Sequence, residues 1–370
     1  MKKSLIALAA LAAVTAASAQ STVTLSGALV ITAGNVSFNG APTRLDIGRS
    51  TASVTMDGSE DLGGGLKANF RIQQGVYGFP TNGGAASTSL TSNTVGNFGD
   101  RQAFLAVTSG FGTFKVGRDL TATSTAVFGA AQVSGVNAMS GIDDNTNDAA
   151  FFANLRSTSL SFATPTIAGF TAYVGITPQN YAGLTLASPS TTIGNGAANA
   201  AAITAGTGIA ADNRPSTAST KQDNPVAFGV IYANGPLTAA LDMTNFEEST
   251  GGLNLKTTSL GVSYDLGVAK VGVGYQAISA DAQADTKSTV VSVSVPVSAE
   301  LSLGAAYGKR AAVANGAWSS AGTKHTLLGA NYALSKRTTL YFAHSKKDVG
   351  GAAVKLLDLK ETGVGIKHTF

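Results

Sequence analysis

The chain has 370 residues, of which 44 are glycine, none is cysteine and only 12% are charged, and its formal net charge is +4. The lack of cysteine excludes a fold held by disulfide bridges, and the small positive excess argues against an electrostatic nucleic-acid-binding protein. Hydrophobic residues still make up 44% of the chain. After the N-terminal segment no stretch approaches the ~18 apolar residues of a membrane-spanning helix, so the hydrophobicity has to be spread in alternation.

Residues 1–19 have the pattern of an export signal. Lys2 and Lys3 precede an apolar run over residues 5–14, and Ala17-Ser18-Ala19 follows with small residues at the cleavage positions. A transmembrane anchor is the alternative, but a run of roughly ten apolar residues is too short for one. We therefore predict a signal peptide over residues 1–19 and a mature chain over residues 20–370. Removal of the two lysines lowers the net charge from +4 to +2.

Segments with a period of two residues recur from residue 22 onward. In LGVSYDL (260–266), the large apolar residues share one face of the strand and the glycine, serine and aspartate share the other. VVSVSVPV (290–297) and LSLGAAY (301–307) repeat this pattern. We count sixteen such runs and predict strands that begin near residues 22, 45, 66, 100, 112, 151, 169, 225, 236, 254, 267, 286, 299, 323, 338 and 356.

Alternating strands fit either a soluble β-sandwich or solenoid, or a transmembrane barrel. A soluble core needs bulky residues on the inner faces, whereas here the second face carries mostly Ser, Thr, Gly, Lys and Asp, and Trp318 is the single tryptophan. The pattern favours apolar faces in contact with lipid and polar faces that line water. An even number of strands also allows the first and last strands to pair, which leaves no open edge.

The connections between these runs fall into two length classes. Short turns are predicted at residues 59–65, 110–112, 165–169, 234–236 and 334–337, and long loops at residues 77–98, 119–149 and 178–223. Short turns on one side and long loops on the other are typical of outer-membrane barrels. The stretch 178–223 is rich in Ala, Gly, Ser and Thr, and we predict a long extracellular loop there without assigning it a function.

Residues for catalysis or cofactor binding do not cluster in the sequence. His325, His344 and His368 lie on separate predicted strands, and no serine-nucleophile or metal-ligand spacing occurs. We therefore expect neither an enzyme nor a bound metal or cofactor.

Six stretches together resemble the general diffusion porins of β-proteobacteria: GSEDLGGGLKANF (58–70), RQAFLAVTSGFGTFKVGRD (101–119), YANGPLTAAL (232–241), YDLGVAK (264–270), LSKRTTLY (334–341) and GIKHTF (365–370). The resemblance spans nearly the whole mature chain. It implies a 16-stranded antiparallel transmembrane β-barrel, assembled as a homotrimer, whose third long loop (119–149) folds inward to constrict the pore. It also implies that Phe370 belongs to the signal read by the barrel assembly machinery.

The family resemblance and the alternation of the strands predict different residues for the pore constriction. The resemblance matches Arg101, Arg118 and Arg156 to wall arginines of the family, with Asp119 beside them. A further family arginine corresponds to Ser53 here, and we expect Arg49 to lie on the same strand face and compensate in part. Strict alternation instead places Lys67 and Arg71 toward the lumen. By the same count Arg101, Arg118 and Arg156 would face outward unless a bulge shifts the register.

These observations predict an outer-membrane channel for passive diffusion of small hydrophilic solutes, with a preference for anions. No charged residue lies between Leu120 and Ile142, so few carboxylates balance the wall arginines. Pairing of those arginines with Asp57 or Asp119 would instead give a neutral lumen. The other candidate functions are a substrate-specific channel, a surface adhesin or receptor, and, most remote, a barrel enzyme. Expected partners are outer-membrane lipid and lipopolysaccharide, the assembly machinery and small anions, but not nucleic acid.

Overall fold

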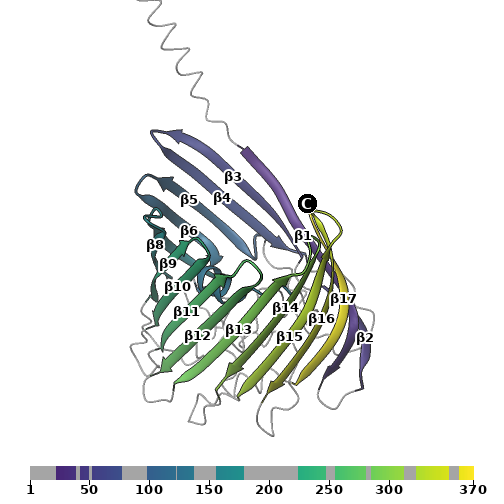
Figure 1. Ribbon diagram of the computed structural model, residues 1–370. Helices are drawn as coiled ribbons and strands as arrows, with labels where there is room; N and C mark the ends of the chain where they lie inside the picture. Colours follow the sequence, from purple (N-terminus) through teal and green to yellow (C-terminus); the bar gives the residue numbers. More distant parts are fainter. Residues whose placement is uncertain are drawn as a thin grey trace, which may run out of the picture.

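The structure is a computed structural model and describes residues 22–38, 42–49, 52–76, 98–121, 123–136, 156–178, 224–246, 255–280, 285–311, 322–349 and 358–370. Nearly all of these residues form strands (Figure 1). The strands are β1 (Thr22–Phe38), β2 (Arg44–Arg49), β3 (Ser53–Gly63), β4 (Leu66–Gly75), β5 (Gln102–Ser109), β6 (Gly112–Leu120), β7 (Arg156–Ala163), β8 (Phe170–Ile176), β9 (Val226–Asn234), β10 (Leu237–Phe246), β11 (Leu255–Asp265), β12 (Lys270–Ala280), β13 (Thr286–Pro296), β14 (Leu301–Arg310), β15 (Thr323–Ala333), β16 (Thr338–Val349) and β17 (Leu359–Thr369). Between β6 and β7 lie a π-helical turn, η1 (Thr123–Val127), and one turn of α-helix, α2 (Phe128–Ala131).

The strands form one closed antiparallel ring. Each strand from β3 to β17 pairs with the next along the chain, and β17 pairs with β1 from Ala28↔Thr369 to Phe38↔Leu359. Along its other edge β1 pairs with β2 through residues 31–36 and with β3 through residues 22–28. Because β2 and β3 share this one edge, they occupy a single position, and the seventeen segments make sixteen positions around the barrel. The predicted 16-stranded fold is confirmed, and every predicted start lies close to a strand or to this broken position.

The break between β2 and β3 corrects one expectation about the wall. In the β1 register Arg49 lies opposite Ile31, whereas Ser53 lies opposite Ala28. Ile31 and Ala28 alternate to different faces of β1, so residues 49 and 53 do not share a face. The expectation that they do was wrong because alternation cannot be counted through an irregular segment.

The short turns all lie at one end of the barrel. At the β3–β4 turn, Gly63, Gly64 and Gly65 have φ of 82°, 62° and 82°, a conformation that favours glycine, and the register shifts by one residue there. The strand ends that lead into the longer connections lie at the opposite end (Figure 1). Of the predicted long loops, residues 77–97 and 179–223 lie outside the described residues, as do residues 137–155 and the predicted signal peptide.

The two faces of the ring differ in side-chain character, as predicted. Large apolar side chains point outward and are exposed on strand after strand, among them Leu105 at 62%, Phe228 at 52%, Val291 at 54% and Val364 at 59%. Small and polar residues, such as Ser259, Ser263 and Ser292, alternate with them and are buried inside. Among the described residues, no helix is long and apolar enough to cross a membrane.

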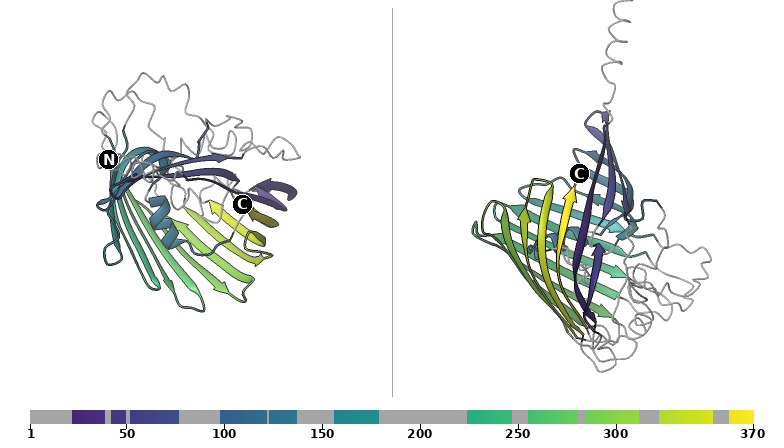
Figure 2. Two further views of the ribbon diagram at one scale, coloured as in Figure 1. Left: turned by 90° about the horizontal axis from the view of Figure 1, so that it is seen from above. Right: turned by 90° about the vertical axis from the view of Figure 1, so that its right-hand side faces the viewer.

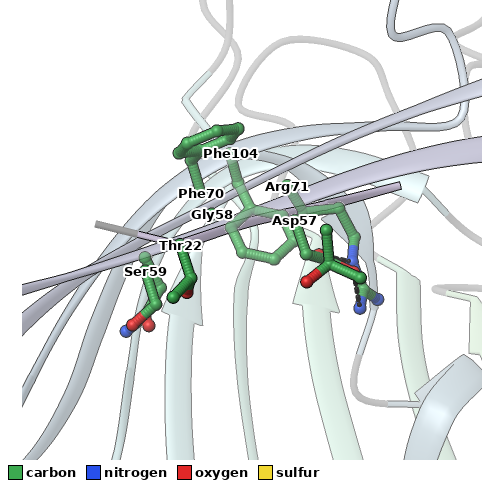
Figure 3. Close-up of a pocket in the computed structure, with 9 residues that line it drawn as sticks. Thr22, Asp57, Gly58, Ser59, Phe70, Arg71 and Phe104 are labelled. Atoms are coloured by element: carbon green, nitrogen blue, oxygen red, sulfur yellow. Dashed lines mark hydrogen bonds and ion pairs between the residues drawn. The ribbon is translucent and has the colours of Figure 1, made fainter. Parts of the chain in front are cut away.

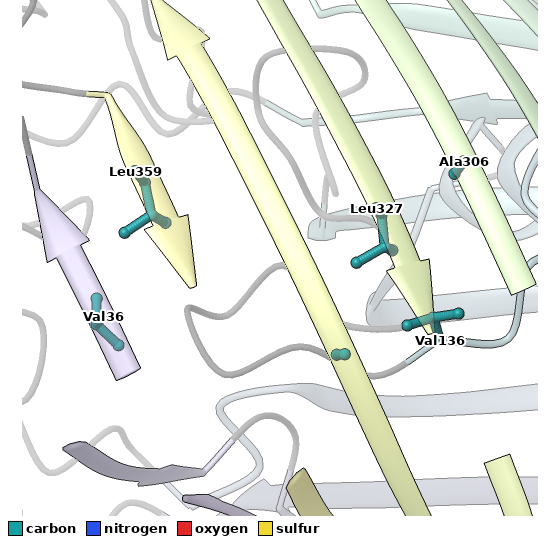
Figure 4. Close-up of a cluster of buried hydrophobic side chains, with 6 residues drawn as sticks. Val36, Val136, Ala306, Leu327 and Leu359 are labelled. Carbon is teal, nitrogen blue, oxygen red and sulfur yellow. The ribbon is translucent and has the colours of Figure 1, made fainter. Parts of the chain in front are cut away.

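One part of the interior is apolar. Val136, which follows α2, packs among residues on the inner faces of β1 and β14–β17 (Figure 4): Val36, Ala306, Leu327, Ala343 and Leu359. Leu327 and Val136 are both fully buried. This cluster lies on the stretch of the ring from β14 through β17 to β1, where apolar residues add to the polar ones inside the barrel.

Candidate pore and its lining

An ion pair between neighbouring strands lies on the polar wall. Arg71 on β4 and Asp57 on β3 are directly opposite in register. Arg71 Nε donates to Asp57 Oδ1 at 2.7 Å, and its Nη2 donates to Oδ2 at 3.1 Å. This is the bidentate geometry in which guanidinium and carboxylate match best. The two side chains are 39% and 37% exposed, so the pair faces water and its charges largely cancel.

A second pair lies on β6. Lys115 and Asp119 are four residues apart, on the same inward face, and their side chains form an ion pair. Asp119 also accepts a hydrogen bond from Gln102 on β5, and the Lys115 ammonium lies 4.6 Å from the centre of the Phe104 ring. Lys115 therefore belongs to the lumen wall. The alternation of Phe114 and Val116 outward already places Lys115 inward, so the signal was present in the sequence.

Two further cations on this wall form no ion pair with an acid in the part of the chain that the structure describes. Arg101 Nε donates to the amide oxygen of Gln73, at 3.3 Å, so the arginine reaches the interior through a neutral partner. Lys67 lies on the inward face of β4, where it is exposed. Asp61 is its cross-strand neighbour, but among the described residues Lys67 forms no ion pair. Arg101 and Lys67 therefore leave positive charge on the wall.

The register puts the other two arginines of the resemblance on the outward face. Arg118 lies opposite Ala103 with no register shift along β6, and it is exposed beside Val116. Its Nε donates to the carbonyl oxygen of Asp100 at 2.8 Å. Arg156 lies opposite Leu120, on the face of β7 that also carries Leu160. The structure thus brings Lys67, Arg71, Arg101 and Asp119 together on the interior wall, whereas the register places the strand positions of Arg118 and Arg156 on the outward face.

The wall is hollowed next to the Arg71–Asp57 pair. Thr22 and Thr24 of β1, Ser59 of β3 and Asn69 of β4 border a cavity of about 390 Å³, together with both members of the pair (Figure 3). Gly58, Phe70 and Phe104 complete its lining. The hydroxyl and amide groups of this lining can form hydrogen bonds with water. They do not form a pocket shaped for one particular ligand.

Residues 123–136 lie inside the barrel, against the wall opposite the charged strands (Figure 2). Four inward glycines allow the backbone of this segment to approach the strands closely. A Cβ on Gly261 of β11 would overlap the carbonyl oxygen of Val127, and a Cβ on Gly272 of β12 would overlap that of Ala131. A Cβ on Gly304 of β14 would overlap the carbonyl oxygen of Ser134, and one on Gly329 of β15 would overlap the side chain of Val136.

Hydrogen bonds hold the same segment in place. Ser292 Oγ on β13 accepts from the backbone N–H of Val133 at 2.9 Å and donates to the carbonyl oxygen of Ala131 at 2.7 Å. Asn331 on β15 donates from Nδ2 to the carbonyl oxygen of Gly135 at 3.0 Å. Val127, Phe128 and Ala131 also pack on Ala240 and Val290 of the wall. The sequence predicted an inward loop but not these contacts. A glycine in a strand does not indicate which part of the chain packs against it.

The described residues contain no group of three or more His, Asp or Glu side chains that could hold a metal ion. Of the three histidines, His325 contacts Ser345 inside the barrel, while His344 and His368 lie outside and contact Thr362 and Thr338. These contacts are between neighbouring strands and support pairing of the sheet.

A closed sixteen-position barrel with an apolar outside, a polar inner wall and a segment folded into its lumen defines a channel protein of a lipid bilayer. The chain belongs to the Gram-negative porin family, whose model matches residues 7–352. It is therefore an outer-membrane porin, a water-filled channel for passive diffusion and not an enzyme. The predicted family, the 16-stranded barrel, the function as a passive diffusion channel and the outer-membrane location are confirmed.

Curated relatives and solved structures agree with this membership. The chain is 31% identical to outer membrane porin protein 32 of Delftia acidovorans over 410 aligned residues, which cover 100% of both proteins. It is 36% identical to the major outer membrane protein P.IB of Neisseria meningitidis serogroup B over 129 residues, 32% of this chain and 34% of the relative. The anion-selective porin from Comamonas acidovorans has a TM-score of 0.66 at 23% identity, covering 95% of this chain and all of that one. OmpT of Vibrio cholerae in its trimer form has a TM-score of 0.56 at 13% identity, with coverages of 95% and 99%.

Proposed function

We propose that this porin prefers anions and that its selectivity is set by the charged wall of β3–β6 facing the uncharged segment 123–136. The observation that carries the proposal is the unequal pairing on this wall. Arg71 and Lys115 are neutralised by Asp57 and Asp119, whereas Arg101 and Lys67 have no carboxylate partner among the described residues. Basic residues that line a pore favour anions.

The position of the inner segment supports this assignment. Counted around the ring, β5 is the fourth position and β13 the twelfth, so they face each other across half of the sixteen positions. Segment 123–136 is held on β10–β15 and contains no Asp or Glu. In the described part of the predicted loop 119–149, Asp119 is therefore the one acidic residue that can neutralise positive charge on the wall. The acidic residues Asp143, Asp144 and Asp148 lie outside the described residues.

The constriction is thus proposed to consist of Lys67, Arg71, Arg101 and Asp119, with Lys115 added from the structure. Arg118 and Arg156 are not included because their register is outward. The structural relative described as an anion-selective porin is in keeping with the proposal. We also propose that the protein assembles as a homotrimer in contact with outer-membrane lipid and lipopolysaccharide, and that the assembly machinery recognises Phe370. A relative with the same fold has a trimer form.

The zero-current potential of single pores under a KCl gradient tests the selectivity. We expect the sign that corresponds to chloride preference, and a shift toward cations in the double variant Arg101→Gln/Lys67→Gln. A pore that prefers potassium in the unmodified protein would refute the proposal. Current block that saturates with one particular solute would instead indicate a substrate-specific channel.

A further inference from the structure

An aromatic ring lies on the charged wall of the lumen. Phe104 on β5 is directly opposite Arg71 on β4, and both side chains are on the inward face. The Lys115 ammonium lies 4.6 Å from the centre of the Phe104 ring. On its other side Phe104 is opposite Gly117 of β6, so no side chain faces the ring from that position. A large apolar residue here departs from the small and polar pattern of the inner faces.

The surroundings of Phe104 differ from those of other inward aromatic residues. Tyr173 donates its hydroxyl to Asp242 at 2.7 Å, and Tyr341 is 3% exposed and shares a hydrogen bond with Thr32. These two side chains make contacts within the wall. Phe104, by contrast, is only partly buried and lines the cavity of about 390 Å³ (Figure 3). It therefore presents apolar surface to a solute in the lumen.

Two guanidinium groups lie near this ring. Arg71 is its cross-strand neighbour, and Cβ atoms in such pairs are about 4.5–5.5 Å apart. Arg101 donates to Gln73, which lies two residues from Arg71 on the same face of β4, about 7 Å further along the strand. Asp57 neutralises Arg71, whereas Arg101 has a neutral amide as its partner. An anionic group next to the ring is therefore within the field of a guanidinium that no described carboxylate offsets.

The wall thus combines an apolar ring with positive charge, and this combination fits an aromatic carboxylate. A carboxylate bonded directly to a ring places its charge beside the ring, as Arg71 and Phe104 lie side by side on the wall. Aromatic rings prefer offset or edge-to-face contact with centroids about 4.5–7 Å apart. The cavity has room for one such ring together with water. An aliphatic carboxylate of similar size would meet the same charges but lack the contact between rings.

We propose that the pore favours aromatic carboxylates over aliphatic carboxylates of the same charge and similar size, because the ring of the solute packs against Phe104 at the constriction. This inference rests on the proposed anion preference and names the class of anion that is favoured. An aromatic pair changes an equilibrium by a factor of about two to ten. We therefore expect benzoate to be about two- to ten-fold more permeable than cyclohexanecarboxylate. A preference of this size is compatible with passive diffusion.

The test is the zero-current potential of single pores at neutral pH, with potassium benzoate on one side and an equal concentration of potassium cyclohexanecarboxylate on the other. The cation is the same on both sides, so the potential reports the difference between the two anions. Phe104→Leu, which keeps an apolar side chain but removes the ring, should bring this potential close to zero. The matched control is Phe114→Leu, the same change on the outward face of β6, where the side chain is 47% exposed. This control should keep the potential of the unmodified protein.

The outcomes separate this inference from the proposed anion preference. A pore that prefers potassium to chloride in a KCl gradient would refute the anion preference itself. A pore that prefers chloride but gives no potential between the two carboxylates would overturn only the role of Phe104, and this measurement on the unmodified protein does not depend on the folding of any variant. Phe104→Tyr keeps the ring and should keep the benzoate preference. An undiminished preference in Phe104→Leu, or an equal loss in Phe114→Leu, would also overturn the proposal.

Discussion

The Arg71–Asp57 ion pair controls how much positive charge the wall of β3–β6 offers to a permeating ion. Both partners are more than one-third exposed, so the pair contributes little to stability, about 0–1 kcal/mol. Its effect on selectivity is more important. At physiological salt the Debye length is about 8 Å, so a charge matters only where ions pass close to it.

Replacing Asp57 by asparagine should therefore strengthen the preference for anions. The change leaves Arg71 without its counter-charge while keeping the size of the neighbouring side chain. A unit charge about 4–8 Å away in water contributes about 0.5–1 kcal/mol, which is about a two- to five-fold change in the permeability ratio. The measurement is the zero-current potential of single channels under a KCl gradient.

Arg71→Ala should shift the potential in the opposite direction, because Asp57 is then unpaired. The control is Arg118→Ala, which removes an arginine whose side chain lies on the outward face and hydrogen-bonds the Asp100 carbonyl. We expect no change in selectivity for this variant. A shift in Arg118→Ala as large as that in Arg71→Ala would show that the outward placement does not hold in the working channel.

At the scale of elements, the strands were predictable from the sequence and the irregular segments were not. β4 alternates without interruption, so Lys67 and Arg71 could be placed inward from the pattern of Leu66, Phe70 and Ile72. The family resemblance, by contrast, matched Arg118 as part of a short stretch of sequence. Such a match does not indicate whether the side chain lies on the inward or the outward face of the strand. The change of face between β2 and β3 was not predictable either, because the segments on both sides of it alternate regularly.

The inner segment shows a second limit of the pattern. From the sequence, Gly261 and Gly272 could equally be small residues that line a water-filled pore. The structure shows instead that the backbone of the inner segment packs against them. Because the segment has few large side chains, its position depends on close approach and on the two hydrogen bonds of Ser292. Small changes on the facing strands should therefore move it.

Adding a methyl group under the inner segment should displace it. In Gly272→Ala the new Cβ overlaps the Ala131 carbonyl oxygen, and overpacking of this kind costs about 1–3 kcal/mol. We expect the segment to shift toward the lumen and the single-channel conductance in KCl to fall. Gly110→Ala is the matched control, since a Cβ there meets no atom within 4 Å. Equal conductance in both variants and the unmodified protein would contradict this role of the glycines.

For the whole molecule, assembly into a trimer is the first property to test. The outward face of each strand is apolar around the ring, so no single patch identifies the interface. The proposal therefore rests on family membership and on the trimer form of a relative. We expect the folded protein to migrate in SDS gels as a trimer without heating and as a monomer after boiling. Identical monomer migration in both samples would contradict it.

Phe370 extends the β1–β17 pairing that closes the ring. The backbone N–H and C=O of Phe370 exchange hydrogen bonds with Gly27 of β1, both at 3.1 Å, and its ring covers Gly27 on the outward face, where a Cβ would overlap it. Phe370 thus pairs the first and last strands and presents an aromatic side chain to lipid, with an exposed fraction of 40%.

Deletion of Phe370 should therefore impair assembly much more than conduction. The truncated chain loses two backbone hydrogen bonds at the seam, about 0.5–1.5 kcal/mol each, which is too little to abolish a barrel of sixteen positions. It also loses the residue proposed as the assembly signal, so we expect accumulation in the periplasm and a low level in the outer membrane. Phe370→Tyr, which keeps an aromatic ring, should restore assembly, whereas Phe370→Ala should not. The few truncated pores that do insert are expected to show normal conductance, because Phe370 lies on the outside of the wall. Normal outer-membrane levels of the truncated chain would show that closure and assembly do not need this residue.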